Sequence, residues 1–81
     1  MKVRFLPRFT QQFSALPQSV QKKVDKQVAF LLRNMRHPSL HTKKYDETQD
    51  IWQARVDDHF RFYFKIIGDT YEMMFVIPHP K

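Results

Sequence analysis

The sequence contains no cysteine, a single glycine and no long run of apolar residues. Without cysteine there are no disulfides, no thiolate metal ligands and no cysteine nucleophile, so hydrophobic packing alone has to hold the fold. One glycine provides no glycine-rich loop to cradle a nucleotide phosphate, which excludes P-loop and dinucleotide-binding motifs. Charged residues also interrupt the amino terminus, where a signal peptide needs an unbroken apolar stretch. We therefore expect a cytoplasmic protein without a membrane-spanning segment or a membrane partner.

The chain has 81 residues, of which 42% are hydrophobic, and this predicts one small domain over residues 1–81. Its net charge of +6 is unevenly placed. Residues 1–44 hold ten Lys or Arg and one acid, which gives +9, whereas residues 45–81 hold four Lys or Arg and seven acids, which gives −3. Such asymmetry indicates a polyanionic or acidic partner, with nucleic acid the first candidate, or else a merely solvated basic surface.

The amino-terminal part predicts a strand followed by two helices. Apolar and charged residues alternate over residues 2–5, which is typical of a short strand, and Pro7 ends it. Apolar residues then recur at helical spacing over residues 8–16, and a longer helix is predicted from Pro17 to Asn34. One apolar stripe marks the longer helix, formed by Val20, Val24, Val28, Leu31 and Met35.

Apolar residues show no periodic spacing over residues 36–50, which are therefore expected to form a loop. Beyond residue 50 they recur at every second position, as in a strand. The pattern predicts a three-stranded antiparallel meander, and Gly68-Asp69 is its second hairpin turn. This turn predicts the pairs Ile66 with Tyr71, Phe64 with Met73, Phe62 with Phe75 and Phe60 with Ile77 on the apolar face, and Lys65 with Glu72, Tyr63 with Met74 and Arg61 with Val76 on the other. We expect an α+β fold in which a strand, a two-helix hairpin and this meander form one sheet packed on the helices.

The alternation of inward and outward residues also determines the first hairpin of the meander. A three-residue loop over residues 57–59 puts Ala54 opposite Phe62 in the core, and it puts Arg55 directly opposite Arg61 on the other face. Like charges in this position cost about 0.2 to 1 kcal/mol, which a bound anion would offset. Because guanidinium groups match phosphate oxygens, the pair predicts a phosphate site. The alternative is that nearby acids of the loop neutralise two surface arginines.

Other polar residues surround this pair in the predicted fold. The same face carries Gln53 as a hydrogen-bonding residue, Tyr63 as a stacking surface and Lys65 as a third cation. Further cations that would contact a nucleic acid are Lys22, Lys23, Lys26 and Arg33 on the long helix, and Lys43 and Lys44 after it.

Three of the four histidines bear on chemistry. His37 and His41 have the spacing of a helical metal site, but Pro38 lies between them, so no metal ion is expected. His79 follows the last strand and is suited to proton transfer at neutral pH. Regular alternation would point His79 toward the core unless Pro78 redirects the chain.

The order of these elements resembles the RelE/ParE superfamily of bacterial type II toxin-antitoxin toxins, in its RelE/YoeB-like branch. The resemblance covers nearly the whole chain and rests on Leu16-Pro17-x-x-Val20-Gln-Lys-Lys-Val24, His37-Pro38-Ser39-Leu40, Trp52-x-x-Arg55-Val56, Phe60-Arg61-Phe62-x-Phe64, the Gly68-Asp69 turn and the late His79. It implies a ribosome-dependent mRNA endonuclease that works without a cofactor or metal by attack of the RNA 2′-hydroxyl. Arg55 and Arg61 would then hold the scissile phosphate, and His79 would act as acid or base.

The resemblance also implies a cognate antitoxin protein as partner, with mRNA and the ribosome as targets. Two alternatives stay open. RelE-type members carry lysines where this chain has Gln53 and Ala54, so the same fold could instead serve a ParE-like inhibitor of DNA gyrase or a non-catalytic binding module for RNA or protein.

Overall fold

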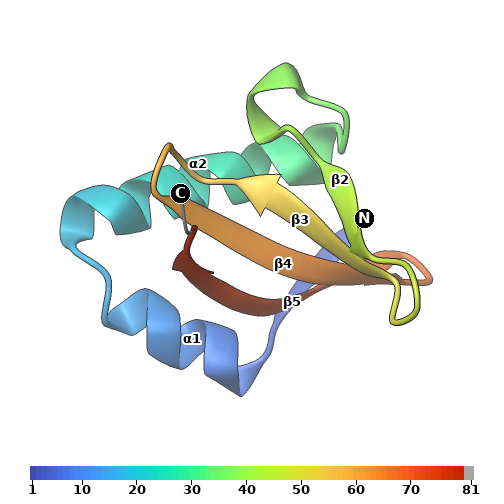
Figure 1. Ribbon diagram of the computed structural model, residues 1–81, viewed down its shortest axis with the longest axis horizontal. Coiled ribbons are helices and arrows are strands. Elements are labelled where there is room, and N and C mark those ends of the chain that lie inside the picture. Colours follow the sequence, from blue (N-terminus) through green and yellow to red (C-terminus); the bar gives the residue numbers. More distant parts are fainter. Residues whose placement is uncertain (80–81) are drawn as a thin grey trace.

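A computed structural model describes residues 1–79 and contains one five-stranded sheet with helices beside it (Figure 1). In chain order the elements are β1 (Lys2–Phe5), α1 (Pro7–Ser14), α2 (Gln18–Arg33), the 3-10 helix η1 (Pro38–Leu40), β2 (Lys43–Asp46), β3 (Ile51–Arg55), β4 (Phe60–Ile67) and β5 (Thr70–Pro78). The strand order is β1-β5-β4-β3-β2, with β1 parallel to β5 and the other neighbours antiparallel. The expected α+β fold is confirmed.

The expectation of a loop over residues 36–50 is wrong in part. This segment contains η1 and the edge strand β2, so the sheet has one strand more than the sequence predicted. The segment Lys43–Asp46 is too polar to show alternation, and its pairing with β3 makes it a strand. His41 joins the two elements in the left-handed region, at a φ of 46°.

The core lies between α2 and one face of the sheet. Its fully buried side chains include Val24 and Leu31 of α2 and Phe62 and Phe64 of β4. Helix α1 follows the edge of β5 beyond the point where β1 ends, and there the Val76 amide donates to Gln12 Oε1 over 2.9 Å. The face of the sheet that points away from the core is not covered by either helix (Figure 1). We call it the uncovered face. No helix within residues 1–79 is long and apolar enough to cross a membrane.

Much of the predicted strand register is confirmed. Strand β3 pairs with β4 from Trp52 opposite Phe64 to Arg55 opposite Arg61. The Gly68-Asp69 turn is also confirmed, because pairing between β4 and β5 runs as expected from Ile67 opposite Thr70 to Phe64 opposite Met73. Lys65 accordingly lies opposite Glu72, although the ion pair of Glu72 is with Arg4, at 3.8 Å.

Beyond Phe64 the predicted register is wrong by one residue. Met74 is the extra residue of a bulge, so the observed pairs are Tyr63 with Phe75, Phe62 with Val76, Arg61 with Ile77 and Phe60 with Pro78. The bulge exchanges the two faces of β5, which buries Val76 in the core and turns Phe75 outward. It also places His79 on the face of Arg61, so the expectation from regular alternation is corrected by the bulge rather than by Pro78.

Candidate phosphate-binding site

Arg55 and Arg61 lie directly opposite each other on the uncovered face. The Arg55 guanidinium forms an ion pair with Asp58 of the loop between the two strands. Arg61 is held by backbone carbonyls: its Nη1 donates to the Phe60 oxygen over 2.9 Å and also to the Asp57 oxygen. Arg61 thus has its position fixed without a carboxylate partner among the described residues, which leaves its charge available to an anion.

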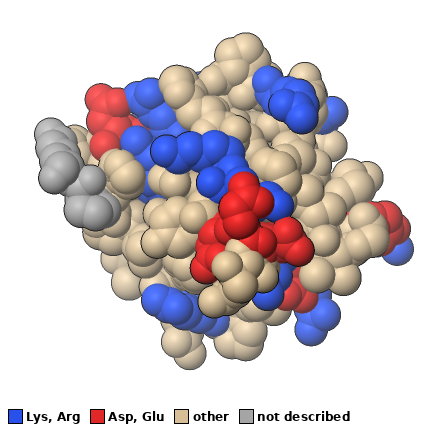
Figure 2. Space-filling view, turned by 45° about the vertical axis from the view of Figure 1, so that its right-hand side comes forward, with Lys and Arg blue, Asp and Glu red and all other residues tan. Residues whose placement is uncertain are grey.

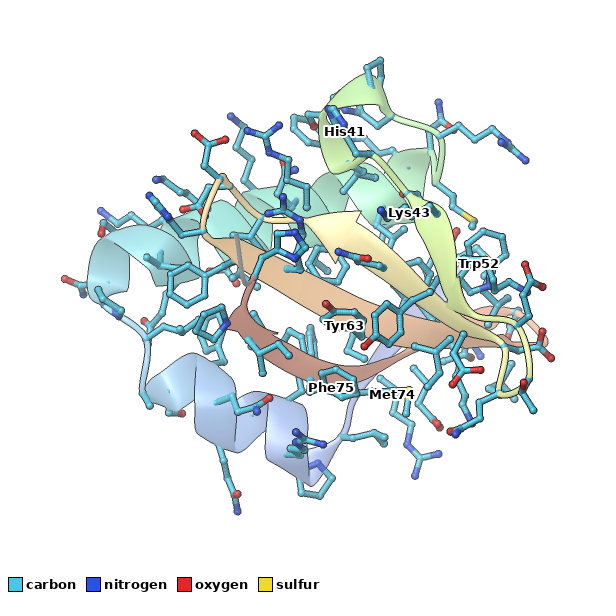
Figure 3. All side chains as sticks on the ribbon, viewed as in Figure 1. His41, Lys43, Trp52, Tyr63, Met74 and Phe75 are labelled. Carbon is cyan, nitrogen blue, oxygen red and sulfur yellow. The ribbon has the colours of Figure 1, made fainter. Side chains whose placement is uncertain are left out.

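Around this pair, the surface forms a hollow of about 220 Å³. We call it the arginine hollow, and its lining residues are His41, Lys43, Gln53, Arg55, Arg61 and His79. Lys43 lies opposite Gln53, and His41, two residues before Lys43, lines the hollow together with Arg55. Four neighbouring strands and their ends therefore supply the hollow. In Figure 3, His41 lies just before β2 and Lys43 at the start of that strand, both above Tyr63.

The surface of this region is strongly basic. In the view of Figure 2, Lys and Arg side chains form a band from the upper left to the centre, with acidic side chains at its two ends. The hollow itself contains Lys43, Arg55 and Arg61, and none of its lining residues within the described range 1–79 is an acid. An anion is the ligand that this composition favours.

His79 occupies the end of the hollow next to β4. Its amide donates to the His59 oxygen over 2.7 Å, which continues the pairing of β5 with the loop. The Nδ1 atom of its ring is buried, and within residues 1–79 it has no hydrogen-bond partner. Because the His79 ring also lines the hollow, a ligand or a water bound there is the available source of the missing hydrogen bond.

Gln27 positions one wall of the site from α2. This side chain is 5% exposed, and its Nε2 donates to the Arg55 oxygen over 2.8 Å and to the Ser39 oxygen over 3.2 Å. The amide thereby ties α2 to the end of β3 and to η1, just before His41. Sequence reasoning missed both Gln27 and His41, although a glutamine between Val24 and Leu31 of the apolar stripe is a signal of a buried polar contact.

Tyr63 does not offer the open stacking surface that the sequence predicted. It is 3% exposed, because Tyr45 packs edge-on at 4.8 Å and Phe75 stacks at 4.6 Å between ring centroids. Burial raises the pKa of Tyr63, and the neighbouring Tyr45 hydroxyl adds to this. The exposed ring is that of Tyr45, which lies over Tyr63 and takes its place as the surface aromatic.

The predicted RNA-binding lysines are not all brought together. Lys43 lines the arginine hollow, whereas Lys44 faces the other side of the sheet, where it lies 4.6 Å from the Trp52 ring and pairs with Asp50. Lys65 lies along β4 away from the hollow, opposite Glu72. On α2, Lys22 is exposed, and the structure puts Lys23 and Lys26 beside Arg55 in a neighbouring hollow.

His37 has a structural role. Its Nδ1 accepts a hydrogen bond from the Ser39 amide over 3.2 Å at the start of η1, and its ring stacks on Phe30 with centroids 3.9 Å apart. Within residues 1–79 no three His, Asp or Glu side chains gather in a way that would hold a metal ion.

Solved toxin structures share this architecture. A YoeB/ParE toxin from Agrobacterium tumefaciens aligns with a TM-score of 0.82 at 13% identity, and the match covers 99% of this chain and 100% of that one. The YoeB dimer from Staphylococcus aureus gives a TM-score of 0.81 at 12% identity, covering 99% and 98%. The archaeal RelE-RelB complex from Pyrococcus horikoshii gives 0.74 at 16% identity, covering 95% and 92%.

Comparison of the sequence with protein-family models gives no match, and comparison with curated proteins gives none either. At 12 to 16% identity the likeness concerns the fold. The match with the Agrobacterium toxin extends over almost the full length of both chains, so it includes the helix pair, the five strands and the loop between Arg55 and Arg61. This chain therefore has the RelE/YoeB-like toxin fold.

Proposed function

We propose that this chain is the toxin of a type II toxin-antitoxin system and that it cleaves mRNA on the ribosome as an endoribonuclease. The observation that carries the proposal is the arginine hollow, in which two arginines, a lysine and two imidazoles meet on one sheet face. The toxin fold of the structural neighbours adds support. Translation would stop because the message is cut in the cytoplasm.

The cations of the hollow suit the charge of the reaction. A phosphodiester carries one negative charge, and the pentavalent transition state formed by attack of an oxygen carries a second. Arg55 and Arg61 would hold the phosphate oxygens by paired hydrogen bonds, and Lys43 would add a third charge. Their attraction grows as the negative charge grows, which stabilises the transition state more than the bound substrate.

The imidazoles supply the proton transfers. The RNA 2′-oxygen attacks the adjacent phosphorus while a base takes the 2′-hydroxyl proton, and the bond from phosphorus to the 5′-oxygen breaks as that oxygen receives a proton. The products are a 2′,3′-cyclic phosphate and a 5′-hydroxyl end. His41 on the Arg55 side and His79 on the Arg61 side are the two groups that we assign to these transfers, and the route is proposed without a metal ion or another cofactor.

An antitoxin is the proposed protein partner. The structural neighbours include RelE with RelB and YoeB with YefM, which are complexes of a toxin and its antitoxin. A partner that covers the positive face of this chain would need acidic or polar groups to match it. Such a partner would block the approach of RNA to the arginine hollow.

The test is induced expression of the wild type, Arg61→Ala and Arg4→Ala, with sequencing of transcript ends. We expect growth arrest with cuts in translated messages for the wild type and for Arg4→Ala, whose arginine is exposed on β1 outside the hollow. Cleavage by Arg61→Ala is expected to be reduced about 100-fold or more. Equal thermal melting of the purified variants establishes that the fold is kept.

Two outcomes would overturn the proposal. Arrest with intact transcripts and inhibited DNA supercoiling would assign the chain to gyrase inhibition. If expression of the wild type is harmless, the chain is a non-catalytic binding module instead.

A further inference from the structure

A second hollow of about 350 Å³ adjoins the arginine hollow. We call it the lysine hollow, and its lining residues are Lys23, Lys26, Gln27, Ser39, His41, Arg55, Val56 and Asp57. His41 and Arg55 line both hollows. The two hollows therefore meet at His41 and Arg55, with the arginine hollow toward β4 and β5 and the lysine hollow toward α2.

The cations of the lysine hollow come from one side of α2. Lys23 and Lys26 are three residues apart, so they project from the same side of the helix. Lys23 is engaged by Asp57, with 3.3 Å between Nζ and Oδ2. Within residues 1–79 Lys26 has no carboxylate partner, and its Nζ lies 5.8 Å from the Phe30 ring centre. Lys26 is thus the available cation.

The acid in this hollow is held in place. The Asp57 carboxylate accepts the His59 and Phe60 amides over 2.8 and 2.9 Å and also pairs with Lys23. Partial burial acts to raise the pKa of Asp57, but these hydrogen bonds outweigh it and lower the pKa. The charge of Asp57 is therefore largely compensated by Lys23, and what remains of it would direct an anion toward Lys26.

The floor of the lysine hollow is neutral. Gln27 has its amide directed to the carbonyls of Ser39 and Arg55, and the Ser39 hydroxyl points to Gln27 Oε1 at 3.4 Å. Val56 completes the floor as a buried apolar residue. With the floor groups already paired, an anion would be bound by the cations of the rim.

We propose that the lysine hollow binds the phosphate next to the scissile one in the same RNA strand, with Lys26 as its ligand and Arg55 between the two phosphates. This inference rests on the proposed function, because it takes the arginine hollow as the site of the scissile phosphate. It assigns Lys26 to the substrate strand, and it leaves Lys22, which lines neither hollow, outside the site.

The test measures binding, so that it does not depend on cleavage. The probes are a 2′-O-methyl trinucleotide with two charged phosphates and the same trinucleotide with one linkage made a neutral methylphosphonate. Each is titrated into the full chain at low salt and followed by amide chemical shifts. We expect the second charge to tighten binding about three- to fivefold in the wild type.

The variants assign that gain to a residue. In Lys26→Ala the gain is expected to vanish, so that both probes bind alike, whereas in the control Lys22→Ala it stays. The inference is overturned if Lys26→Ala keeps the full gain, or if Lys22→Ala loses it equally, since the latter indicates a diffuse field of the helix. Lys26 is exposed, and unchanged amide spectra of the free variant show that the fold is intact.

The outcomes also separate this inference from the proposed function. If Arg61→Ala binds the singly charged probe as tightly as the wild type does, the arginine hollow is not the site of the scissile phosphate. If Arg61→Ala does weaken that binding but the second charge adds nothing, the scissile-phosphate site stands and only the lysine hollow is wrongly assigned.

Discussion

Tyr63 of β4 lies opposite Phe75 of β5, and Met74 is the extra residue between two regular stretches of pairing. On the carboxyl side of this bulge, the inward and outward positions of β5 are exchanged. Val76 enters the core at 2% exposure, and His79 reaches the arginine hollow. One inserted residue therefore sets both the end of the core and the composition of the site.

Deletion of Met74 tests this relationship. With Met74 removed, Phe75 follows Met73 directly, so regular pairing keeps Tyr63 opposite Phe75 and Phe62 opposite Val76. We therefore expect the deletion to cost about 1 kcal/mol or less in the free energy of unfolding. Met74→Ala keeps the residue count and is expected to cost about 1 kcal/mol or less. Urea unfolding of the two variants makes the comparison. A loss of more than about 2 kcal/mol for the deletion alone would contradict the role given to the bulge, because in a bulge-free pairing the deletion would exchange the faces of Phe75 and Val76.

The sequence predicted the strand pairs near its turns and failed farther away. Gly68 adopts a φ of 59°, which suits the first central position of the predicted hairpin turn, and the turn fixes its nearest pairs. The bulge at Met74 has no such signal, because both registers place apolar residues inward: Phe75 would fill the position that Val76 takes. Only the packing of the whole core distinguishes them.

The candidate site was predictable to the same extent. The pairing of Arg55 with Arg61 follows from the length of the first hairpin loop. Only a three-residue loop keeps the apolar residues on one face and the arginines on the other. His41 enters the site through the pairing of β2 with β3, and the polar segment around Lys43 carries no strand pattern. Gln27 depends on a contact 28 residues along the chain, with the Arg55 carbonyl, that no local pattern specifies.

Phe62→Ala tests the core. Phe62 has no exposed surface and packs in the cluster between β4 and α2, so its loss is expected to cost about 3 to 5 kcal/mol. Phe5→Ala is the matched control, because Phe5 is 46% exposed and its truncation is expected to cost far less. The measurement is urea unfolding followed by tryptophan fluorescence of Trp52. A small loss for Phe62→Ala would contradict the assigned inner face of β4.

Gln27→Ala tests the support of the site from α2. Removing the amide leaves the Arg55 and Ser39 carbonyls without their donor, which is expected to cost about 1 to 3 kcal/mol. Gln21→Ala is the control on the same helix, because Gln21 donates to the Phe13 oxygen over 2.9 Å. Both variants lose stability, but only Gln27→Ala is expected to weaken binding of a 2′-O-methyl dinucleotide. Equal binding by the two would make Gln27 a purely structural residue.

Asp57 predicts a pH dependence of stability. Burial opposes ionisation of this carboxyl, yet the amides of His59 and Phe60 and the Lys23 ammonium outweigh it and lower its pKa below the usual 3.8. A lowered pKa in the folded state stabilises the fold above about pH 3.8, and this contribution is lost as the pH falls through the folded-state pKa. The stability difference between wild type and Asp57→Asn is thus expected to be constant at neutral pH and to shrink below about pH 4. Urea unfolding across this range measures it, and a difference that grows on acidification would have the wrong sign.

Asp58 competes with the proposed ligand for Arg55. Its carboxylate pairs with the Arg55 guanidinium, and its own side chain is 76% exposed, so a phosphate can displace it. Asp58→Asn is therefore expected to tighten binding of the 2′-O-methyl dinucleotide by up to about fivefold, the worth of a surface ion pair. The gain is expected to disappear in an Arg55→Ala background, and Asp69→Asn, which removes an exposed charge paired with Lys2 at 3.8 Å, is expected to leave binding unchanged. If Asp58→Asn gains as much without Arg55, the effect comes from net charge alone and Asp58 does not compete at the site.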